Sequence, residues 1–239
     1  MPSVVHTRVD RVDAKLCEAA RGASVSDLHE SLGGTLALSQ TMSHRMRPLL
    51  PGVRIAGPAV TACCPPGDNL MMHRSLFLSQ AGDVLVVQCP DSGAQWGDMA
   101  AFYAKHKGLA GVVVDGHIRD VDDLVLLQSA AWSTKIWPST PDKRAHGSVN
   151  APIVCDGVRV EPGDLVVADG DGVIVIPKAM AADVVGRALQ RKEREDAVRQ
   201  KILAGGHPWH LHGCDRNYEQ LGIREIDAPW QGKAQATLD

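Results

Sequence analysis

Two short, continuous apolar runs, strand-like over residues 84–88 and 111–115, constrain the fold more than any other feature of the sequence. Uninterrupted Val and Leu residues are typical of strands that are covered on both faces, as in parallel sheets. Residues 97–107 between the runs have the pattern of a helix, and Gly108 stands where a helix C-cap belongs. This order predicts a βαβ unit whose right-handed crossover brings its two loops to one edge of the sheet. Asp115-Gly116 is a turn signal, so we expect the second strand to end there.

A cation and two carboxylates flank that edge. Arg119 and Asp120 follow the second strand directly, and Asp98 opens the helix. The first amides of a helix have no partner within the helix and can bind an anion. Here those amides belong to Gly97, Asp98, Met99 and Ala100. Because Arg119 supplies a bidentate anchor as well, we expect a small carboxylate to bind at this edge of the sheet.

Asp98 and Asp120 also predict a divalent cation at the same place. Mg²⁺ prefers a site with few protein carboxylates and several waters. A second interpretation stays open, in which Asp120 is the N-cap of a helix over residues 121–131 and Asp98 is an acid in the first turn of its own helix. Capping uses one carboxylate oxygen, so Asp120 could serve both purposes.

The composition narrows the class of protein. The chain has 239 residues, of which 44% are hydrophobic and 22% charged, values typical of a single globular domain with a sizeable core. The formal net charge of −3 provides no basic surface, so neither nucleic acid nor a membrane is expected as a partner. The N-terminus lacks the apolar core of a signal peptide, and the six cysteines form no C-x-x-C pair. We therefore expect a cytoplasmic protein with reduced thiols.

The N-terminal part of the chain is predicted to begin with a helical segment, residues 1–50. Val9 to Leu32 reads as helical, with a capping box at Ser24–Asp27. Val53 to Cys63 is rich in β-forming residues, and Gly57-Pro58 predicts a bend or a sheet edge within it.

Two loops are open to more than one interpretation. Gly67–Asn69 is typical of a turn and helix cap, or of a ligand loop with free amides, and the cap is favoured. Lys143, Arg144 and His146 could line the site of a polyanionic substrate or be solvated. Solvation is slightly favoured, because charged loop residues are mostly exposed.

The second half of the chain is dense in strand and turn signals. Four short runs predict a hairpin-rich region over residues 153–155, 158–160, 165–168 and 173–176. Lys178 to Leu203 predicts one long charged helix, which belongs to a C-terminal helix and tail over residues 178–239.

Two groups of possible metal ligands fit a structural interpretation better. Asp169 and Asp171 lack the other ligands of a calcium loop and indicate a plain turn. In the tail, His207, His210, His212 and Cys214 fit no structural zinc spacing, so the role of these histidines stays open.

Several motifs together resemble those of the RraA-like family, and within it the class II pyruvate aldolases that cleave 4-hydroxy-4-methyl-2-oxoglutarate and 4-carboxy-4-hydroxy-2-oxoadipate. They cover most of the chain and are specific only in combination. The motifs are Pro66–Asn69 with Met72-His73, Gly82–Val87, Trp96–Ala100, Asp115–Asp120, Gly147–Pro152, Gly163-Asp164 and Ala168–Val173. The resemblance implies a layered α/β/β/α sandwich with a central βαβ unit, a hairpin-rich second half and a long C-terminal helix.

The resemblance also implies roles for single residues. The amides of Gly97 to Ala100 and Arg119 would hold the pyruvate portion of the substrate, and Asp120 would ligate the metal directly. Asp98 would hold water bound to that metal, which would be Mg²⁺ by preference, with Mn²⁺ or Co²⁺ as alternatives. Glu195 aligns with a glutamate that the aldolases contribute to a neighbouring subunit's site, with Glu193 as the alternative. A homotrimer or homohexamer with intersubunit active sites is therefore implied.

The function implied by the resemblance is metal-dependent retro-aldol cleavage of a 4-hydroxy-2-oxo acid with two or three carboxylates. The products would be pyruvate and a second carbonyl acid, as in aromatic-acid catabolism, with oxaloacetate decarboxylation as a side activity. Two alternatives are a regulatory or binding protein of the RraA type without catalysis and a dedicated β-keto acid decarboxylase. The loop Asp91–Gln95 and the tail His207–Gly213 depart from the pattern of the aldolases. The identity of the leaving fragment is therefore left open.

Overall fold

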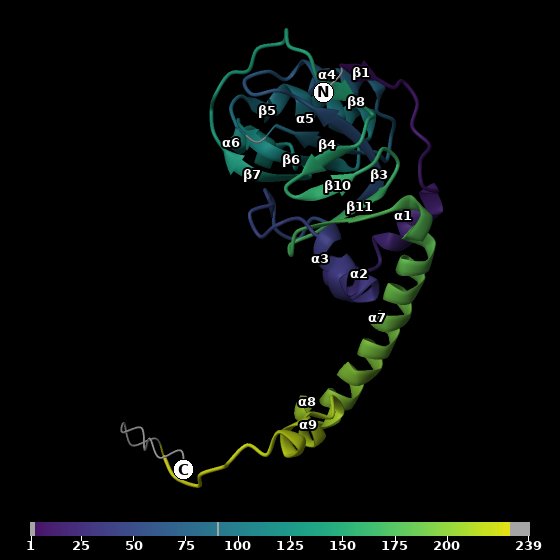
Figure 1. The fold of residues 1–239 in the computed structure, drawn as a ribbon, viewed down its shortest axis with the longest axis vertical. Coiled ribbons are helices and arrows are strands. Elements are labelled where there is room, and N and C mark those ends of the chain that lie inside the picture. The colour runs from purple at the N-terminus through teal and green to yellow at the C-terminus, as the bar shows by residue number, and fades with distance from the viewer. Residues whose placement is uncertain (1–2, 90, 230–239) are drawn as a thin grey trace. The chain divides into compact units, whose positions relative to one another are not determined.

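The computed structural model describes residues 3–89 and 91–229, which fall into two compact units, Met1–Lys192 and Glu193–Asp239 (Figure 1). The end of the predicted tail, residues 230–239, lies outside the described residues. Among the described residues, no helix is both long enough and apolar enough to cross a membrane.

A parallel sheet forms the centre of the first unit. Its inner strands are β3 (Ile55–Cys63), β4 (Val84–Gln88), β6 (Gly111–Ile118) and β7 (Ala131–Ile136), which pair in that order and run parallel. Helix α5 (Asp98–Lys107) connects β4 to β6 and ends at Gly108, which has the left-handed conformation of a C-cap. Adjacent, parallel β4 and β6 confirm the predicted βαβ unit, whose strands are apolar because both of their faces are buried.

Four shorter strands extend the sheet at its edges and ends. They are β1 (Val4–Val5), β2 (Arg47–Pro48), β5 (Ala94–Trp96) and β8 (Ser148–Val149). Strand β2 pairs antiparallel with β7, β8 pairs antiparallel with β3, and β1 pairs parallel with β8. Strand β5 pairs with the last residues of β6, where the pairing of β6 with β7 also shifts register. β6 therefore continues to Ile118, and the expectation that Asp115-Gly116 ends it is wrong.

Strand β3 continues through Gly57-Pro58, where the sequence predicts a bend or a sheet edge. The strand changes partners there. Its first four residues pair antiparallel with β11 (Leu165–Ala168), and from Ala59 onward it pairs parallel with β4. A Cβ on Gly57 would lie 2.1 Å from the carbonyl oxygen of Gly82, so only glycine allows this approach.

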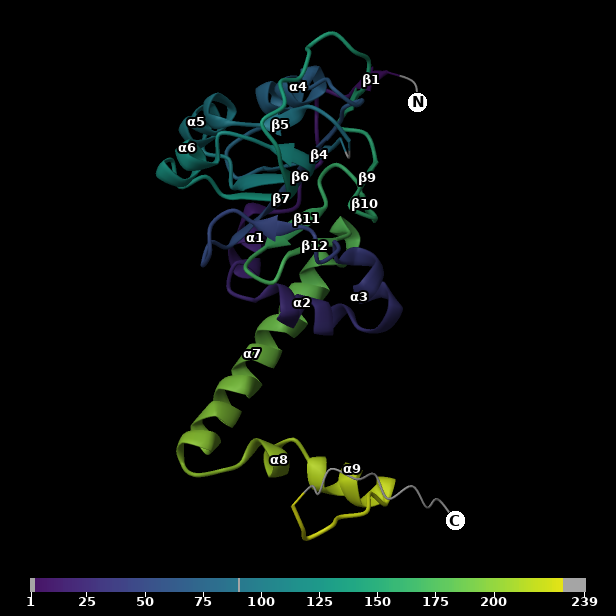
Figure 2. The ribbon, with the colours of Figure 1, turned by 90° about the vertical axis from the view of Figure 1, so that its left-hand side faces the viewer.

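The first unit has four layers, with three apolar cores between them. Figures 1 and 2 show the helices and strands that make up these layers. The first core lies between one face of the sheet and helices α4 (Leu70–Leu78), α5 and α6 (Val121–Leu126). The second lies between the opposite face and the β layer that contains β9 (Ile153–Cys155), β10 (Val158–Val160), β11 and β12 (Val173–Ile176). The third lies between β11–β12 and helices α1 (Ala14–Ala20), α2 (Val25–Leu32) and the start of α7 (Ala181–Leu203). This order confirms the predicted α/β/β/α fold and its hairpins.

The ends of two helical segments differ from the prediction. Helix α6 ends at Leu126 and not at residue 131, because β7 already begins at Ala131. Residues 9–13 are not helical, whereas α3 (Gly34–Gln40) is a further helix within residues 1–50, beyond the predicted run from Val9 to Leu32. The capping box of α2, in which Ser24 and Asp27 each bind the other's backbone, is confirmed.

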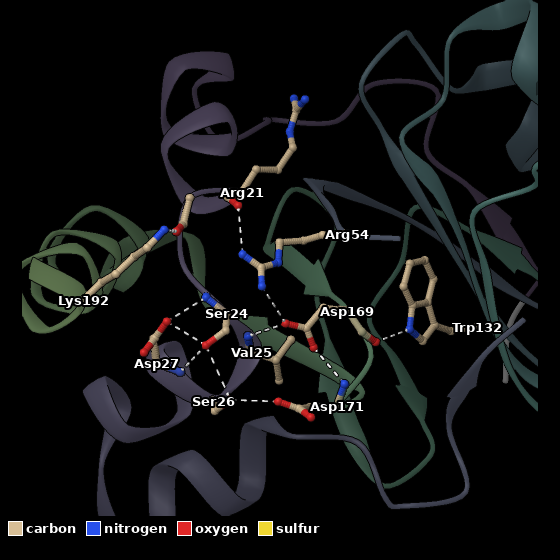
Figure 3. A network of polar contacts seen from close by, with 11 residues as sticks. Arg21, Ser24, Val25, Ser26, Asp27, Arg54, Trp132, Asp169, Asp171 and Lys192 are labelled. Atoms are coloured by element: carbon tan, nitrogen blue, oxygen red, sulfur yellow. Dashed lines mark hydrogen bonds and ion pairs between the residues drawn. The ribbon is translucent and has the colours of Figure 1, made fainter. Parts of the chain in front are cut away.

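The turn between β11 and β12 ties α2 to the sheet (Figure 3). The Asp169 carboxylate accepts hydrogen bonds from the amides of Val25 and Asp171, at 3.0 and 2.9 Å. Its carbonyl accepts one from the indole nitrogen of the fully buried Trp132, at 2.8 Å. Asp169 and Asp171 therefore form the structural turn that the sequence indicates.

The long C-terminal helix is confirmed, as α7 preceded by the 3₁₀ turn η1 (Lys178–Met180). The second unit contains the end of α7 and two short helices, α8 (Pro208–Leu211) and α9 (Cys214–Leu221). Trp209 and Tyr218 pack edge to face, with ring centroids 5.4 Å apart. No residue of α8 or α9 is buried, so these helices have no core of their own.

Candidate active site

Two loops that follow neighbouring strands meet at one end of the sheet. β5 leads through Gly97 into α5, and β6 leads through Arg119 and Asp120 into α6. The amide of Arg119 donates to the carbonyl of Trp96 at 2.9 Å, and the amide of Asp98 donates to Oδ2 of Asp120 at 3.3 Å. The structure thus brings the Asp120 carboxylate to the backbone at Asp98, at the edge of the sheet that the sequence predicts for Arg119, Asp120 and Asp98.

Asp120 has an unusual backbone conformation for its position. It precedes α6 as the N-cap residue, with φ 58° and ψ 41°, in the left-handed region. Its side chain makes no capping hydrogen bond to α6 and instead accepts from the first amide of α5. The guanidinium Nε of Arg119 lies 3.4 Å from the same oxygen. A left-handed non-glycine residue is strained and is concentrated at functional sites, and here the strain turns the carboxylate away from its own helix.

Gly97 allows the Asp120 carboxylate to reach α5. A Cβ on Gly97 would lie 2.5 Å from Oδ2 of Asp120 and 3.4 Å from Cγ of Arg119. The backbone of Gly97 is extended, with φ −159°, so any residue could adopt its conformation. The reason for a glycine here is therefore the close approach of Asp120, which no local sequence signal reveals.

The N-terminus of α5 and Arg119 form an anion-binding corner. The first backbone hydrogen bond of the helix runs from Ala101 to the carbonyl of Gly97, so Met99 and Ala100 have no acceptor within the helix. Arg119 is about one-third exposed, and one of its terminal nitrogens donates to the hydroxyl of Thr140 at 3.3 Å. A carboxylate bound here would meet two free amides, a helix dipole and a guanidinium.

These groups line a pocket of about 220 Å³. Its remaining walls come from α4, from the residues before it, from β5 and from the loop after β7. The lining residues are Asn69, Met72, His73, Ala94, Gln95, Trp96, Gly97, Asp98, Met99, Ala100, Arg119, Thr140, Pro141 and Lys143. Gln95 has no sequence signal. Its side-chain nitrogen donates to the carbonyls of Asp68 and Gly93 and so joins two loops behind the pocket.

The turn at Gly67–Asn69 is a structural clamp beside the pocket. The Asp68 carboxylate accepts hydrogen bonds from the amides of Leu70 at 2.8 Å, Arg144 at 2.5 Å and Ala145 at 3.0 Å. Burial alone would raise the pKa of Asp68, but these hydrogen bonds outweigh it and lower the pKa below its usual value. The favoured interpretation of the turn as a cap is supported for Asp68, which binds the first amide of α4.

The two carboxylates fit a divalent cation that keeps several waters. No hydrogen bond or ion pair engages the Asp98 side chain within residues 3–89 and 91–229, and Asp120 offers its second oxygen. In the same part of the chain, no three His, Cys, Asp or Glu side chains come together as a metal site. A site with two protein carboxylates suits Mg²⁺, which binds through few protein ligands and retains water.

Glu195 is not among the residues that line this pocket. It lies in the part of α7 that belongs to the second unit, together with the alternative Glu193. The histidines of the tail also lie in that unit, where His210 Nδ1 is 3.0 Å from an Asp215 carboxylate oxygen and His207 caps α8. One chain therefore supplies Arg119, Asp98 and Asp120 from its first unit and the glutamates from its second.

Comparison with known proteins gives matches over most of the chain. The family model described as RraA-like, Aldolase/RraA, matches residues 14–175. A protein of Halalkalibacterium halodurans that carries the provisional name 4-hydroxy-4-methyl-2-oxoglutarate aldolase is 34% identical over 179 residues, which are 74% of this chain and 83% of that protein.

Solved structures agree with the sequence match. RraAS2 of Streptomyces coelicolor, described as an unusual member of the RNase ES inhibitor RraA family, has 32% identity and a TM-score of 0.70. The match covers 80% of this chain and all of RraAS2. A protein of Pseudomonas syringae of uncharacterized function has 25% identity and a TM-score of 0.72 over 82% of this chain and 96% of its own. The chain belongs to the RraA-like family.

Proposed function

We propose that this protein is a divalent-metal-dependent pyruvate aldolase. It cleaves a 4-hydroxy-2-oxo acid with two or three carboxylates to pyruvate and a second carbonyl acid. The observation that carries the proposal is the Asp120 carboxylate, which turns away from its own helix toward Asp98, Arg119 and the free amides of α5. The relatives named as aldolases support the same function.

The corner at α5 would bind the 2-oxo acid portion of the substrate. Arg119 and the amides of Met99 and Ala100 would hold its carboxylate, because all of them are unpaired donors or positive charges. Asp120 would hold the metal directly, with Asp98 close to it. When bound, the cation would stabilise the negative charge that develops on the 2-oxo oxygen as the carbon–carbon bond breaks.

The chain must also move one proton. In the cleavage, the C4 hydroxyl loses its proton as the C3–C4 bond breaks, and the electron pair of that bond forms the pyruvate enolate. A carboxylate oxygen of Asp98, or of Glu195, would accept the proton, directly or through water, and its delivery to C3 of the enolate would give pyruvate. Oxaloacetate should lose CO₂ at the same site, because its C3–C4 cleavage gives the same enolate.

The position of Glu195 makes the assembly part of the proposal. We infer a homotrimer or homohexamer in which Glu195 of one copy lies at the pocket of its neighbour. The amphipathic, coreless helices of the second unit would then also pack against another copy.

The proposed function is tested by measuring pyruvate release, coupled to NADH oxidation by lactate dehydrogenase. The substrates are 4-hydroxy-4-methyl-2-oxoglutarate and oxaloacetate, each with Mg²⁺ and with a chelator. We expect metal-dependent release from both, faster from the aldol substrate. Faster release from oxaloacetate would instead indicate a dedicated β-keto acid decarboxylase.

A regulatory protein is the second candidate, since one solved relative is described as a member of an RNase inhibitor family. The absence of pyruvate release from a folded protein with metal present would favour it.

A further inference from the structure

His73 lies at the wall of the pocket without an assigned role. It is the fourth residue of α4 and is exposed, and it lines both the 220 Å³ pocket and a neighbouring apolar groove formed with Leu76, Phe77 and Tyr103. Its ring makes no hydrogen bond to any residue in the described part of the chain. An accessible, unpaired imidazole in a pocket wall can donate an N–H to a ligand.

Lys143 lies on the same wall, close enough that its charge acts on the imidazole. Partial desolvation of the ring in the pocket wall, and then the Lys143 ammonium, lower the pKa of His73 below its usual value and favour the neutral ring. Both residues line the pocket, in which Asp98 is the one acidic lining residue. This wall therefore offers a positive charge and an N–H donor. The Asp68 carboxylate, whose pKa the Lys143 charge helps to lower, is already engaged by three backbone amides.

Hydrogen bonds join the two segments that carry His73 and Lys143. The buried Asp68 carboxylate accepts from the amides of Arg144 and Ala145, which directly follow Lys143. The amide of Asn69 donates to the carbonyl of Asp142 at 3.0 Å, just before Lys143. The loop with Lys143 is thus clamped to the turn from which α4 starts, and His73 lies one turn into that helix. Such support from a second layer of hydrogen bonds is typical of a preorganised binding site.

We propose that His73 is a specificity-determining residue that, together with Lys143, binds the distal carboxylate of the substrate. The inference rests on the proposed function, in which Arg119 and α5 hold the 2-oxo carboxylate. The pocket then has two places for an anion, and its substrate carries a carboxylate at each end. His73 takes no proton in the reaction and acts on binding.

The test compares His73→Leu, which removes the donor, with His73→Gln, which retains an N–H at similar reach. His106→Leu is the matched control, because His106 is an exposed histidine on α5 that does not line the pocket. For each variant, the KM and kcat for 4-hydroxy-4-methyl-2-oxoglutarate and the inhibition constant of pyruvate are measured. Pyruvate lacks the distal carboxylate and occupies only the Arg119 end.

We expect His73→Leu to raise KM about 10-fold, as for a lost hydrogen bond to a charged group, with kcat nearly unchanged. The inhibition constant of pyruvate should change less than about twofold, and His73→Gln should recover most of the KM. An unchanged KM, or a parallel rise in the pyruvate constant, would overturn the assignment. If the wild-type protein releases no pyruvate, the proposed function itself fails, which is a different result from an active wild type with an insensitive His73.

Discussion

Gly97→Ala should remove most of the activity without unfolding the protein. The new methyl group would lie 2.5 Å from Oδ2 of Asp120, and real Cβ contacts shorter than 3.0 Å essentially never occur. The Asp120 carboxylate must therefore move away from residue 97 by about 0.5 Å or more. Asp120 can do so by rotating its side chain, since the contact involves no backbone atom. The displacement would break its hydrogen bond to Asp98 and move the proposed metal ligand.

A misplacement of about 1 Å within a catalytic site can reduce the rate about 100-fold, so a displacement of about 0.5 Å or more should reduce it by about 10-fold or more. The cost in the free energy of unfolding should stay below about 1 kcal/mol, because Gly97 is extended and one weak hydrogen bond is lost. Urea unfolding and coupled pyruvate release measure the two effects separately. Gly170→Ala is the control, since a Cβ there meets nothing within 4 Å. Wild-type activity in Gly97→Ala would refute the argument that Asp120 must occupy this position.

Three further predictions concern stability and assembly. Asp68→Asn should lower the free energy of unfolding by about 2 kcal/mol at pH 7, because its carboxylate receives three amides. Since the pKa of Asp68 is lowered in the folded state, this contribution is present above the unfolded pKa of about 4 and is lost as pH falls through the folded pKa. Urea unfolding between pH 3 and 7 should therefore show that the difference in unfolding free energy between the wild-type protein and Asp68→Asn becomes smaller in acid. A constant difference would contradict this. Arg11→Met should lower the free energy of unfolding by about 3 kcal/mol in the same assay, because it leaves the fully buried Asp83 carboxylate without its bidentate partner. A loss below about 1 kcal/mol would contradict the role of this pair. Glu195→Gln should reduce pyruvate release, whereas Glu193→Gln should not. If sites are shared between copies, mixing Glu195→Gln with an inactive pocket variant should restore part of the activity.

Most of the fold could be predicted because it depends on local patterns. The β-branched runs give β4, β6 and the four strands of the second half, and Gly108 marks the end of α5. The partner change within β3 could not be predicted, because it depends on pairing with β11, more than 100 residues away in the sequence. The register shift at which β6 continues past Gly116 likewise could not be predicted, because it depends on pairing with β5 and β7.

The candidate site divides in the same way. Arg119, Asp120 and Asp98 could be placed together because the loops of a βαβ unit share one edge of the sheet. The conformation of Asp120 and the close approach that requires Gly97 are tertiary features without a sequence signature. The placement of His73 and Lys143 on one pocket wall depends on the hydrogen bonds of Asp68, which join segments about 75 residues apart.

Stabilisation of a pyruvate enolate by the site, with the help of a metal at Asp120, can be tested without knowing the natural substrate. The measurement follows exchange of the pyruvate methyl protons in D₂O by proton NMR. Asp122→Ala is the matched control for Asp120→Ala, since Asp122 is an acid in the first turn of the same helix. We predict exchange with Mg²⁺ in the wild-type protein and in Asp122→Ala, and a loss of about 100-fold or more with chelator or in Asp120→Ala. Undiminished exchange in Asp120→Ala, or none in the folded wild-type protein with metal, would contradict the account.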